Sequence, residues 1–125
     1  MKQSQRIDVI TVYGIKNCDQ CRRALKWLGD MGVQHSFHDF RVDGLSKALL
    51  QEFCEHVSWE NILNKRGTTW RRLSDSQKDG ISAANAQELM LSNPTLIKRP
   101  VFKITNTILI GFSGDELEKL KSIVL

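Results

Sequence analysis

The sequence predicts a mixed α/β fold, and three features of the chain indicate it. A strand, a helix and a second strand follow one another over the first 40 residues, which is typical of a parallel β-α-β unit. A hairpin of two strands and a last helix occupy residues 101–125. Helical periodicity dominates the residues in between. We therefore expect one mixed sheet of four strands, in which a parallel pair and an antiparallel pair meet.

The opening β-α-β unit is predicted from apolar periodicity. The run Ile7–Tyr13 is almost continuously apolar and rich in β-branched residues, as in a buried central strand. Gly14 ends it, and a short loop leads to a helix for which we predict Asp19 as the N-cap. Gly32 suits the position after this helix, and Val33–Phe40 is predicted as the second strand. The apolar face of the helix carries Cys21, Ala24, Leu25, Leu28 and Met31.

The middle of the chain, about residues 45–92, is predicted to be a helical insertion. We expect helices over Ser46–His56, around Trp59–Leu63 and over Ser82–Ser92. Two polar stretches, Lys65–Arg72 and Ser74–Gly80, are predicted to be connections between them. The apolar stripe of the first of these helices is expected to consist of Leu45, Leu49, Phe53 and Val57.

The end of the chain carries the second pair of strands. After Pro100, the segments Val101–Ile104 and Thr107–Ile110 form a predicted hairpin. The residues Ser113–Glu116 match a capping box, so the last helix should begin there. Without the insertion, this order of elements is that of a thioredoxin-like domain. We therefore interpret residues 1–125 as a single domain of that type, with the insertion packed beside its sheet.

Composition narrows the classes of function. The 125 residues are 41% apolar and 26% charged, which allows a packed core. No run approaches the roughly 20 apolar residues of a membrane span, and no signal peptide is visible, so we expect a cytoplasmic protein without a membrane partner. The 18 Lys and Arg against 14 Asp and Glu give a net charge of +4, which suits an anionic ligand. The basic stretch Lys65–Arg72 is interpreted as a solvated rim and not as a nucleic-acid surface, because acidic residues occur throughout the chain.

The cysteines indicate thiol chemistry. Cys18 and Cys21 form a C-x-x-C at the first strand-to-helix turn, which is a redox signature. The thiolate is the reactive form of cysteine, and a helix N-terminus stabilises it. Lys16, Arg22 and Arg23 add positive charge nearby. We therefore predict that Cys18 is the nucleophile and that Cys21, one turn later, or glutathione is the resolving thiol.

Other interpretations of these residues stay open. Cys21 also belongs to the apolar stripe of its helix, so it can be a buried, inert thiol. A zinc site would need His35 and His38, which are three residues apart in a predicted strand and so point to opposite faces. Cys54 lies beside Phe53 on an amphipathic helix and is interpreted as a small core residue.

Several segments resemble the ArsC/Spx/YffB family of proteins related to glutaredoxin-coupled arsenate reductase. The resemblance rests on Tyr13–Asp19, Asn64–Arg71, Asn93–Pro100 and the pair Gly111-Phe112. It covers nearly the whole chain, and the Arg-Gly-Thr-Thr-Trp-Arg stretch is most similar to the YffB branch. The resemblance implies a thioredoxin-like fold that is interrupted by a helical insert.

The resemblance also implies roles for individual residues. Cys18 matches the family's catalytic cysteine, and Arg99 matches the arginine that binds anions beside the thiolate and precedes a cis-proline, here Pro100. A guanidinium is well suited to this task because it is always charged and donates from a rigid fork. No bound cofactor or metal is expected. The expected substrate-binding residues are Lys16, Asn17, Arg66, Lys98 and Pro100.

The resemblance implies three functions, and we order them by the positions at which the sequence departs from the family pattern. Asn64 and the pair Gly111-Phe112 stand where arsenate reductases of this type carry further arginines, so arsenate reduction ranks third. A thiol-disulfide oxidoreductase with glutathione as co-substrate, acting on glutathione or a protein thiol or disulfide, ranks first. The Spx branch carries a C-x-x-C at this position as a redox switch. The second hypothesis is therefore a redox-sensing transcriptional regulator that binds RNA polymerase.

Overall fold

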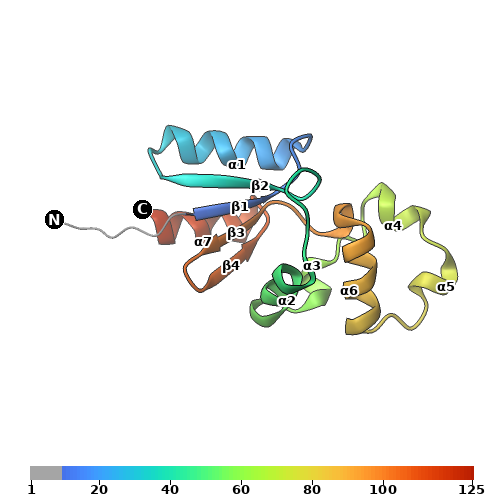
Figure 1. Cartoon of the computed structure of the whole chain (residues 1–125). Coiled ribbons are helices and arrows are strands. Elements are labelled where there is room, and N and C mark those ends of the chain that lie inside the picture. The colour runs from blue at the N-terminus through green and yellow to red at the C-terminus, as the bar shows by residue number, and fades with distance from the viewer. Residues whose placement is uncertain (1–9) are drawn as a thin grey trace. The chain divides into compact units, whose positions relative to one another are not determined.

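The computed structural model describes residues 10–125, which divide into two compact units (Figure 1). The first unit combines the chain up to Asp43 with Arg99–Leu125, and the second unit is Gly44–Lys98. Residues 7–9 of the predicted opening strand lie outside the described residues. Within the described part of the chain, no helix is long and apolar enough to cross a membrane.

The first unit contains a mixed sheet of four strands in the order β2-β1-β3-β4. Strand β1 pairs in parallel with β2 and antiparallel with β3, and β3 pairs antiparallel with β4. The predicted mixed sheet is confirmed. The strands are β1 (Ile10–Gly14), β2 (His35–Asp39), β3 (Val101–Ile104) and β4 (Thr107–Ile110).

Strand β2 is shorter than the predicted Val33–Phe40. The N–H of Val33 donates to the carbonyl of Leu28 at the end of the preceding helix, so Val33 belongs to the turn. After Asp39 the chain turns, because the Asp39 carbonyl accepts the N–H groups of Val42 and Asp43. These local hydrogen bonds compete with the sheet at both ends of the strand.

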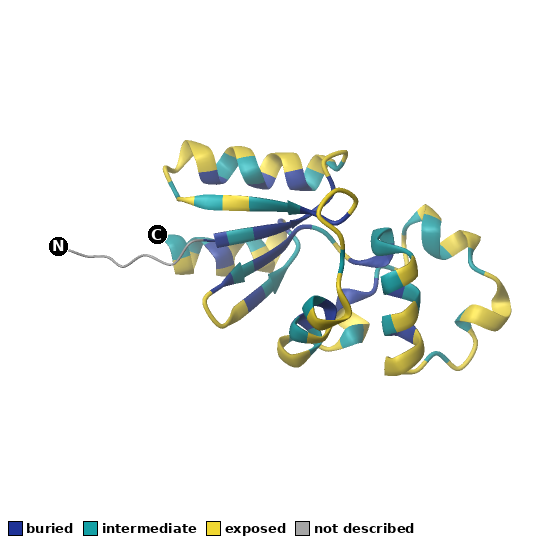
Figure 2. Ribbon diagram, viewed as in Figure 1, coloured by how far each residue is buried: buried dark blue, intermediate teal, exposed yellow. Residues whose placement is uncertain are grey.

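Two helices, α1 (Asp19–Asp30) and α7 (Gly114–Val124), share one apolar core with the sheet. Figure 2 shows α1 with its buried residues on one side and its exposed residues on the other. Leu117 and Val124 of α7 also pack against this core. The buried cluster consists of Ile10, Val12, Ala24, Leu28, Phe102, Ile104, Phe112 and Leu120.

The helix caps correct two predictions. The N-cap of α1 is Cys18 and not Asp19, because the Cys18 sulfur accepts the N–H of Cys21 while Asp19 already has helical geometry. Ser113 precedes α7 but makes no side-chain cap hydrogen bond, so the predicted capping box is absent. The next residue, Gly114, has φ +56°, which lies outside the helical range. The backbone at the start of α7 therefore departs from the geometry in which an N-cap side chain accepts an N–H of the first turn. At the other end of α1, Gly32 has φ +69° and follows the helix as predicted.

The second unit is helical. Helix α6 contacts both α2 and α3, and Leu63 forms an isolated antiparallel bridge with Ile97. The buried residues of α2 are Leu50 and Phe53, so the predicted stripe is right at Phe53 and misses Leu50. The helices are α2 (Lys47–His56), α3 (Trp59–Ile62), α4 (Thr68–Arg72), α5 (Asp75–Lys78), α6 (Ala83–Ser92) and a 3₁₀ turn over Pro94–Leu96.

Short helices occupy both stretches that were predicted to be connections. Helix α5 begins at a capping box in which Ser74 and Gln77 bond each other's backbone N–H groups. In α4, the Trp70 ring has the ammonium groups of Lys65, before the helix, and Lys78, in α5, each 5.5 Å from its centre. Neither helix has a buried residue, so their sequences lack the apolar periodicity on which the prediction relied.

Candidate functional site

Cys18 lies at the N-terminus of α1, in the loop that leaves the central strand β1. Its backbone is extended, with φ −146° and ψ 121°, and its carbonyl accepts the N–H of Arg22 at 2.9 Å. Its sulfur accepts the N–H of Cys21 at 3.4 Å. The thiol is half-buried. Cys18 therefore caps the helix with its own sulfur, and the unpaired N–H groups of the first turn favour negative charge on it.

Cys21 lies one turn further along α1 and is 1% exposed. Its sulfur packs directly over Gly14, where a Cβ atom would come within 2.3 Å of it. Position 14 therefore needs glycine because the Cys21 sulfur lies too close to leave room for a side chain. The position of Gly14 at the end of a strand does not reveal this requirement. All three cysteines, Cys18, Cys21 and Cys54, are free thiols.

The two thiols of the C-x-x-C have opposite pKa shifts. Partial burial alone would raise the pKa of Cys18, but hydrogen bonds from the backbone and thiol of Cys21, and the Arg99 guanidinium, together hold this pKa below its ordinary value. Burial raises the pKa of Cys21 to about 12, and its hydrogen bond to Cys18 adds to that shift. At neutral pH the pair therefore favours a thiolate on Cys18 and a protonated thiol on Cys21.

Arg99 is the first residue of the segment that returns to the sheet. It is half-buried, and its guanidinium hydrogen-bonds the Cys18 sulfur. The Arg99–Pro100 peptide bond is cis, as the family resemblance implies, and Pro100 is buried. Cys18, Cys21, Arg99 and Pro100 thus belong to one unit of the molecule, although more than 75 residues separate the two pairs in the sequence.

A buried carboxylate holds the loop that carries Cys18. Asp39, at the end of β2, is 7% exposed, and its Oδ2 accepts the N–H of Lys16 at 3.0 Å. Its Oδ1 accepts the N–H of Arg41 at 2.8 Å, and its own N–H donates to Asp43 Oδ2 at 2.9 Å. A further hydrogen bond joins the ends of β1 and β2, because the Gly14 carbonyl accepts the N–H of Phe40 at 2.8 Å. Sequence reasoning missed Asp39, although an acidic residue near the end of a predicted strand is a signal that could have drawn attention to it.

The remaining predicted substrate-binding residues fall into both units. Lys16 and Asn17 lie exposed in the loop before Cys18, and Asn17 Oδ1 accepts a hydrogen bond from Arg22 Nη1 at 3.5 Å. Lys98 and Arg66 are exposed in the second unit. The N–H of Lys98 donates to the carbonyl of Ile62 at 2.8 Å.

Cys54 stands apart from this site. It lies half-buried on α2 in the second unit, and burial raises the pKa of its thiol. No group of three or more His, Cys, Asp or Glu side chains comes together among residues 10–125 in a way that could hold a metal ion.

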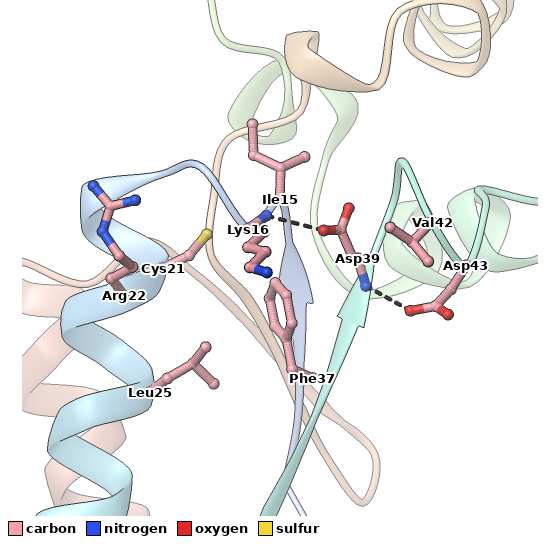
Figure 3. A pocket seen from close by; sticks show the side chains of 9 residues that line it. All are labelled: Ile15, Lys16, Cys21, Arg22, Leu25, Phe37, Asp39, Val42 and Asp43. Carbon is pink, nitrogen blue, oxygen red and sulfur yellow. Dashed lines mark hydrogen bonds between the residues drawn. The ribbon is translucent and has the colours of Figure 1, made fainter.

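A pocket of about 410 Å³ adjoins the C-x-x-C (Figure 3). Residues from α1, from β2 and from the loops that follow β1 and β2 line it. Cys21 contributes to its lining. The pocket therefore lies beside the buried member of the thiol pair.

Comparison with known proteins identifies the family of the chain. The model of the ArsC family matches residues 13–120. The chain belongs to the ArsC family. The resemblance predicted from the sequence is thereby confirmed.

Three similar proteins show how far the similarity extends. An uncharacterised protein of Haemophilus influenzae is 44% identical over 110 residues, which cover 88% of this chain and 96% of the relative. The solved structure of a YffB protein is 35% identical, has a TM-score of 0.87 and covers 94% of this chain and 100% of its own. The global transcriptional regulator Spx of Streptococcus agalactiae is 31% identical over 112 residues, which cover 87% of this chain and 80% of the regulator. The thioredoxin-like fold with its helical insertion is thus shared with the ArsC family.

Proposed function

We propose that this ArsC-family chain is a glutathione-linked thiol reductase that acts through the Cys18 thiolate. The observation that carries the proposal is the position of the Cys18 sulfur. It caps α1, accepts the N–H of Cys21 and is hydrogen-bonded by the Arg99 guanidinium. Donors that favour the charged sulfur increase the fraction of thiolate at neutral pH, and the thiolate is the attacking species.

The reaction that we propose has two exchange steps. The Cys18 thiolate attacks the glutathione sulfur of a mixed disulfide R–S–S–G, so a Cys18–SG bond forms, the R–SG bond breaks and R–S⁻ leaves and takes up a proton. The thiolate of a second glutathione then attacks Cys18–SG, which releases oxidised glutathione and regenerates the Cys18 thiolate. The substrate sulfur becomes a thiol and one glutathione is oxidised, because the other half of the oxidised glutathione comes from the mixed disulfide. Glutathione acts as a co-substrate, and the chain needs no resident cofactor.

We assign the second step to glutathione because Cys21 is poorly suited to it. Its sulfur is buried against Gly14, and its pKa of about 12 keeps it protonated near neutral pH. The hydrogen bond and the charge of Cys18 contribute to that shift and would vanish in the Cys18–SG intermediate. Burial, the largest cause, would persist. Attack by Cys21 would therefore require the chain around it to rearrange.

The expected binding residues fit the charge of glutathione, which carries two carboxylates. Arg99 lies beside the sulfur and Asn17 is exposed in the same loop as Cys18, whereas Lys16 lines the pocket beside Cys21. Arg66 and Lys98 remain candidate anion-binding residues of the second unit. A glutathione-linked reaction requires a reducing compartment, so we propose that the protein acts in the cytoplasm.

Arsenate reduction receives less support. Gly111 has φ +97°, a conformation that an arginine would adopt only under strain, and Phe112 is part of the apolar core. The side chain of Asn64 is engaged as well, because its Oδ1 accepts the N–H of Arg66 at 3.0 Å. Fewer guanidinium groups are therefore available to neutralise arsenate than the family pattern provides.

The test is turnover of a glutathione mixed disulfide, combined with mass spectrometry of the oxidised protein. We expect Cys18→Ser to abolish turnover and Cys21→Ser to retain most of it. A redox titration should show one glutathione on Cys18 and little Cys18–Cys21 bridge. Full activity of Cys18→Ser would refute the proposal, and a dominant intramolecular bridge would transfer the resolving role to Cys21.

A second candidate function is redox-sensing regulation through RNA polymerase. The observation that favours it is the 31% identity with the regulator Spx, together with a C-x-x-C at a helix N-terminus. In that case oxidation would close Cys18 and Cys21 into a disulfide and alter a docking surface. A pull-down of RNA polymerase with the reduced and the oxidised chain tests it. Failure of both forms to retain the polymerase would count against this candidate.

A further inference from the structure

The pocket beside the C-x-x-C has the size and character of a ligand site. Its volume of about 410 Å³ falls within the range of roughly 300–1,000 Å³ that is typical of such sites. Ile15, Leu25, Phe37 and Val42 supply apolar side chains to it. Figure 3 shows Leu25 on α1 and Phe37 on β2 beside the space between these elements, with Ile15 at the end of β1 and Val42 in the loop after β2. Val42 is 80% exposed, so a large apolar side chain is left in water beside an apolar wall.

The polar groups of this pocket leave one cation available for a ligand. The carboxylates of Asp39 and Asp43 already accept backbone N–H groups. The guanidinium of Arg22 is bonded to Asp19 and Asn17. By contrast, no carboxylate among the described residues pairs with the ammonium group of Lys16. The pocket thus combines apolar walls with an unpaired positive charge, and an apolar group next to an anion complements it.

The pocket lies beside the residues that hold the reactive sulfur, although Cys18 itself does not line it. Cys21 lines the pocket, and its N–H donates to the Cys18 sulfur. Lys16 lines it too, two residues before Cys18 in the same loop. A mixed disulfide that Cys18 attacks would therefore bring the residues that flank its sulfurs near the pocket. Glutathione has no large apolar side chain, so the pocket fits the other half of a mixed disulfide better.

We infer that this pocket binds the protein half of the substrate, through an apolar side chain that lies next to an acidic one. The inference rests on the proposed thiol reductase function and names its substrate class, a protein thiol flanked by these two residue types. The apolar side chain would contact Leu25, Phe37 and Val42, and the acidic side chain would pair with Lys16.

An exchange equilibrium tests this inference without depending on the rate of turnover. The full chain carrying glutathione on Cys18 is mixed with a peptide thiol, and the reaction Cys18–SG + peptide–SH ⇌ Cys18–S–S–peptide + GSH is followed by mass spectrometry. Two peptides of equal length are compared, in which Leu-Glu or Ser-Gln follows the cysteine. Because the pocket would desolvate the leucine, we expect an exchange constant roughly tenfold larger, or more, for the Leu-Glu peptide.

Matched variants locate the source of the preference. Val42→Asp should reduce the ratio of the two exchange constants to about one, because it places a carboxylate at the pocket. Lys16→Gln should remove only the part of the preference that is due to Glu. In this variant the exchange constants of a Leu-Glu and a Leu-Gln peptide should therefore be equal. Ile123→Asp, which alters a residue of α7 that is 44% exposed, should leave the ratio unchanged.

The outcomes separate this inference from the function on which it rests. Equal exchange constants for the two peptides, with both adducts formed on Cys18, would overturn the inference and leave the proposed function standing. Persistence of the preference in Val42→Asp would likewise overturn it. If Cys18 forms no adduct with either glutathione or a peptide, the proposed function fails and the inference fails with it.

Discussion

The sulfur of Cys21 lies so close to Gly14 that the strand has no room for a side chain at this position. A Cβ atom on Gly14 would meet the Cys21 sulfur at 2.3 Å, whereas the Cys21 Cβ and Phe37 Cε1 would be at ordinary distances of 3.6 and 3.7 Å. The end of the central strand and the first turn of α1 are thus fitted to each other through one thiol. This contact contributes to the burial of Cys21, which is 1% exposed.

Gly14→Ala should destabilise the protein by about 1–3 kcal/mol, because the added methyl group overpacks the contact with Cys21. Urea unfolding measures the change. The double variant Gly14→Ala/Cys21→Ala should recover much of the loss, since the sulfur that the methyl group meets is gone. Additive destabilisation in the double variant would show that the contact with Cys21 is not the cause.

Cys21→Ala should raise the pKa of Cys18, because it removes the thiol that donates a hydrogen bond to the Cys18 sulfur. The pH dependence of alkylation by iodoacetamide measures this pKa directly. Cys21→Ser should keep it closer to the wild-type value, because a hydroxyl group can donate in the same place. An alkylation midpoint that is the same in both variants would contradict a role for the Cys21 thiol.

Arg99→Ala should also raise the pKa of Cys18, because it removes both a hydrogen bond and a positive charge from the sulfur. Loss of a charge-assisted hydrogen bond of about 1.5–3 kcal/mol should lower kcat/KM for a glutathione mixed disulfide roughly 10- to 100-fold. Arg99→Lys should have a kcat/KM between those of the wild type and Arg99→Ala, because an ammonium group keeps the positive charge but lacks the forked donors of a guanidinium. Unchanged kcat/KM in Arg99→Ala would exclude the arginine from the reaction.

The stability of the protein should decrease at alkaline pH because of Cys21. An unfolded thiol has a pKa near 8.5, whereas the folded pKa of Cys21 is about 12, so the folded chain holds this proton more tightly. Its contribution is therefore complete below about pH 8.5 and is lost as the pH rises toward 12. Unfolding in urea across this range should show the decrease. Cys21→Ala should flatten it, whereas Cys54→Ala, at a half-buried thiol, should leave most of it in place.

Asp39→Ala should loosen the loop that carries Cys18. It leaves the N–H groups of Lys16 and Arg41 without their acceptor, at a cost of about 1–3 kcal/mol. Hydrogen exchange at the Lys16 amide should accelerate, and Asp39→Asn should restore part of the protection. Asp30→Ala is the control, because it removes an exposed carboxylate that pairs with Lys26, and water screens that pair. Equal amide exchange in wild type and Asp39→Ala would mean that the loop does not depend on Asp39.

Prediction from the sequence succeeded where the signal is local. The strand-helix-strand opening, the C-terminal hairpin and the position of the C-x-x-C at a strand-to-helix turn follow from periodicity and from glycine positions over a few residues. It was wrong where two local patterns compete or none exists. Asp19 has a better N-cap composition than Cys18, yet the sulfur occupies the cap. The helices α4 and α5 have no buried residue, so their sequences lack the apolar periodicity from which a helix is predicted.

The same distinction between local patterns and contacts of distant residues applies to the candidate site. The candidate residues could be predicted from the sequence alone: a thiol pair at a helix start and an arginine before a proline, in segments that match the family. How the two thiols differ appears only in the folded chain, because that difference depends on contacts between residues distant in the sequence. Gly14 buries Cys21, Asp39 holds Lys16 from 23 residues away, and Arg99 reaches Cys18 across the sheet unit. Burial and hydrogen bonding shift a thiol's pKa only through such contacts, and no spacing in the sequence encodes them.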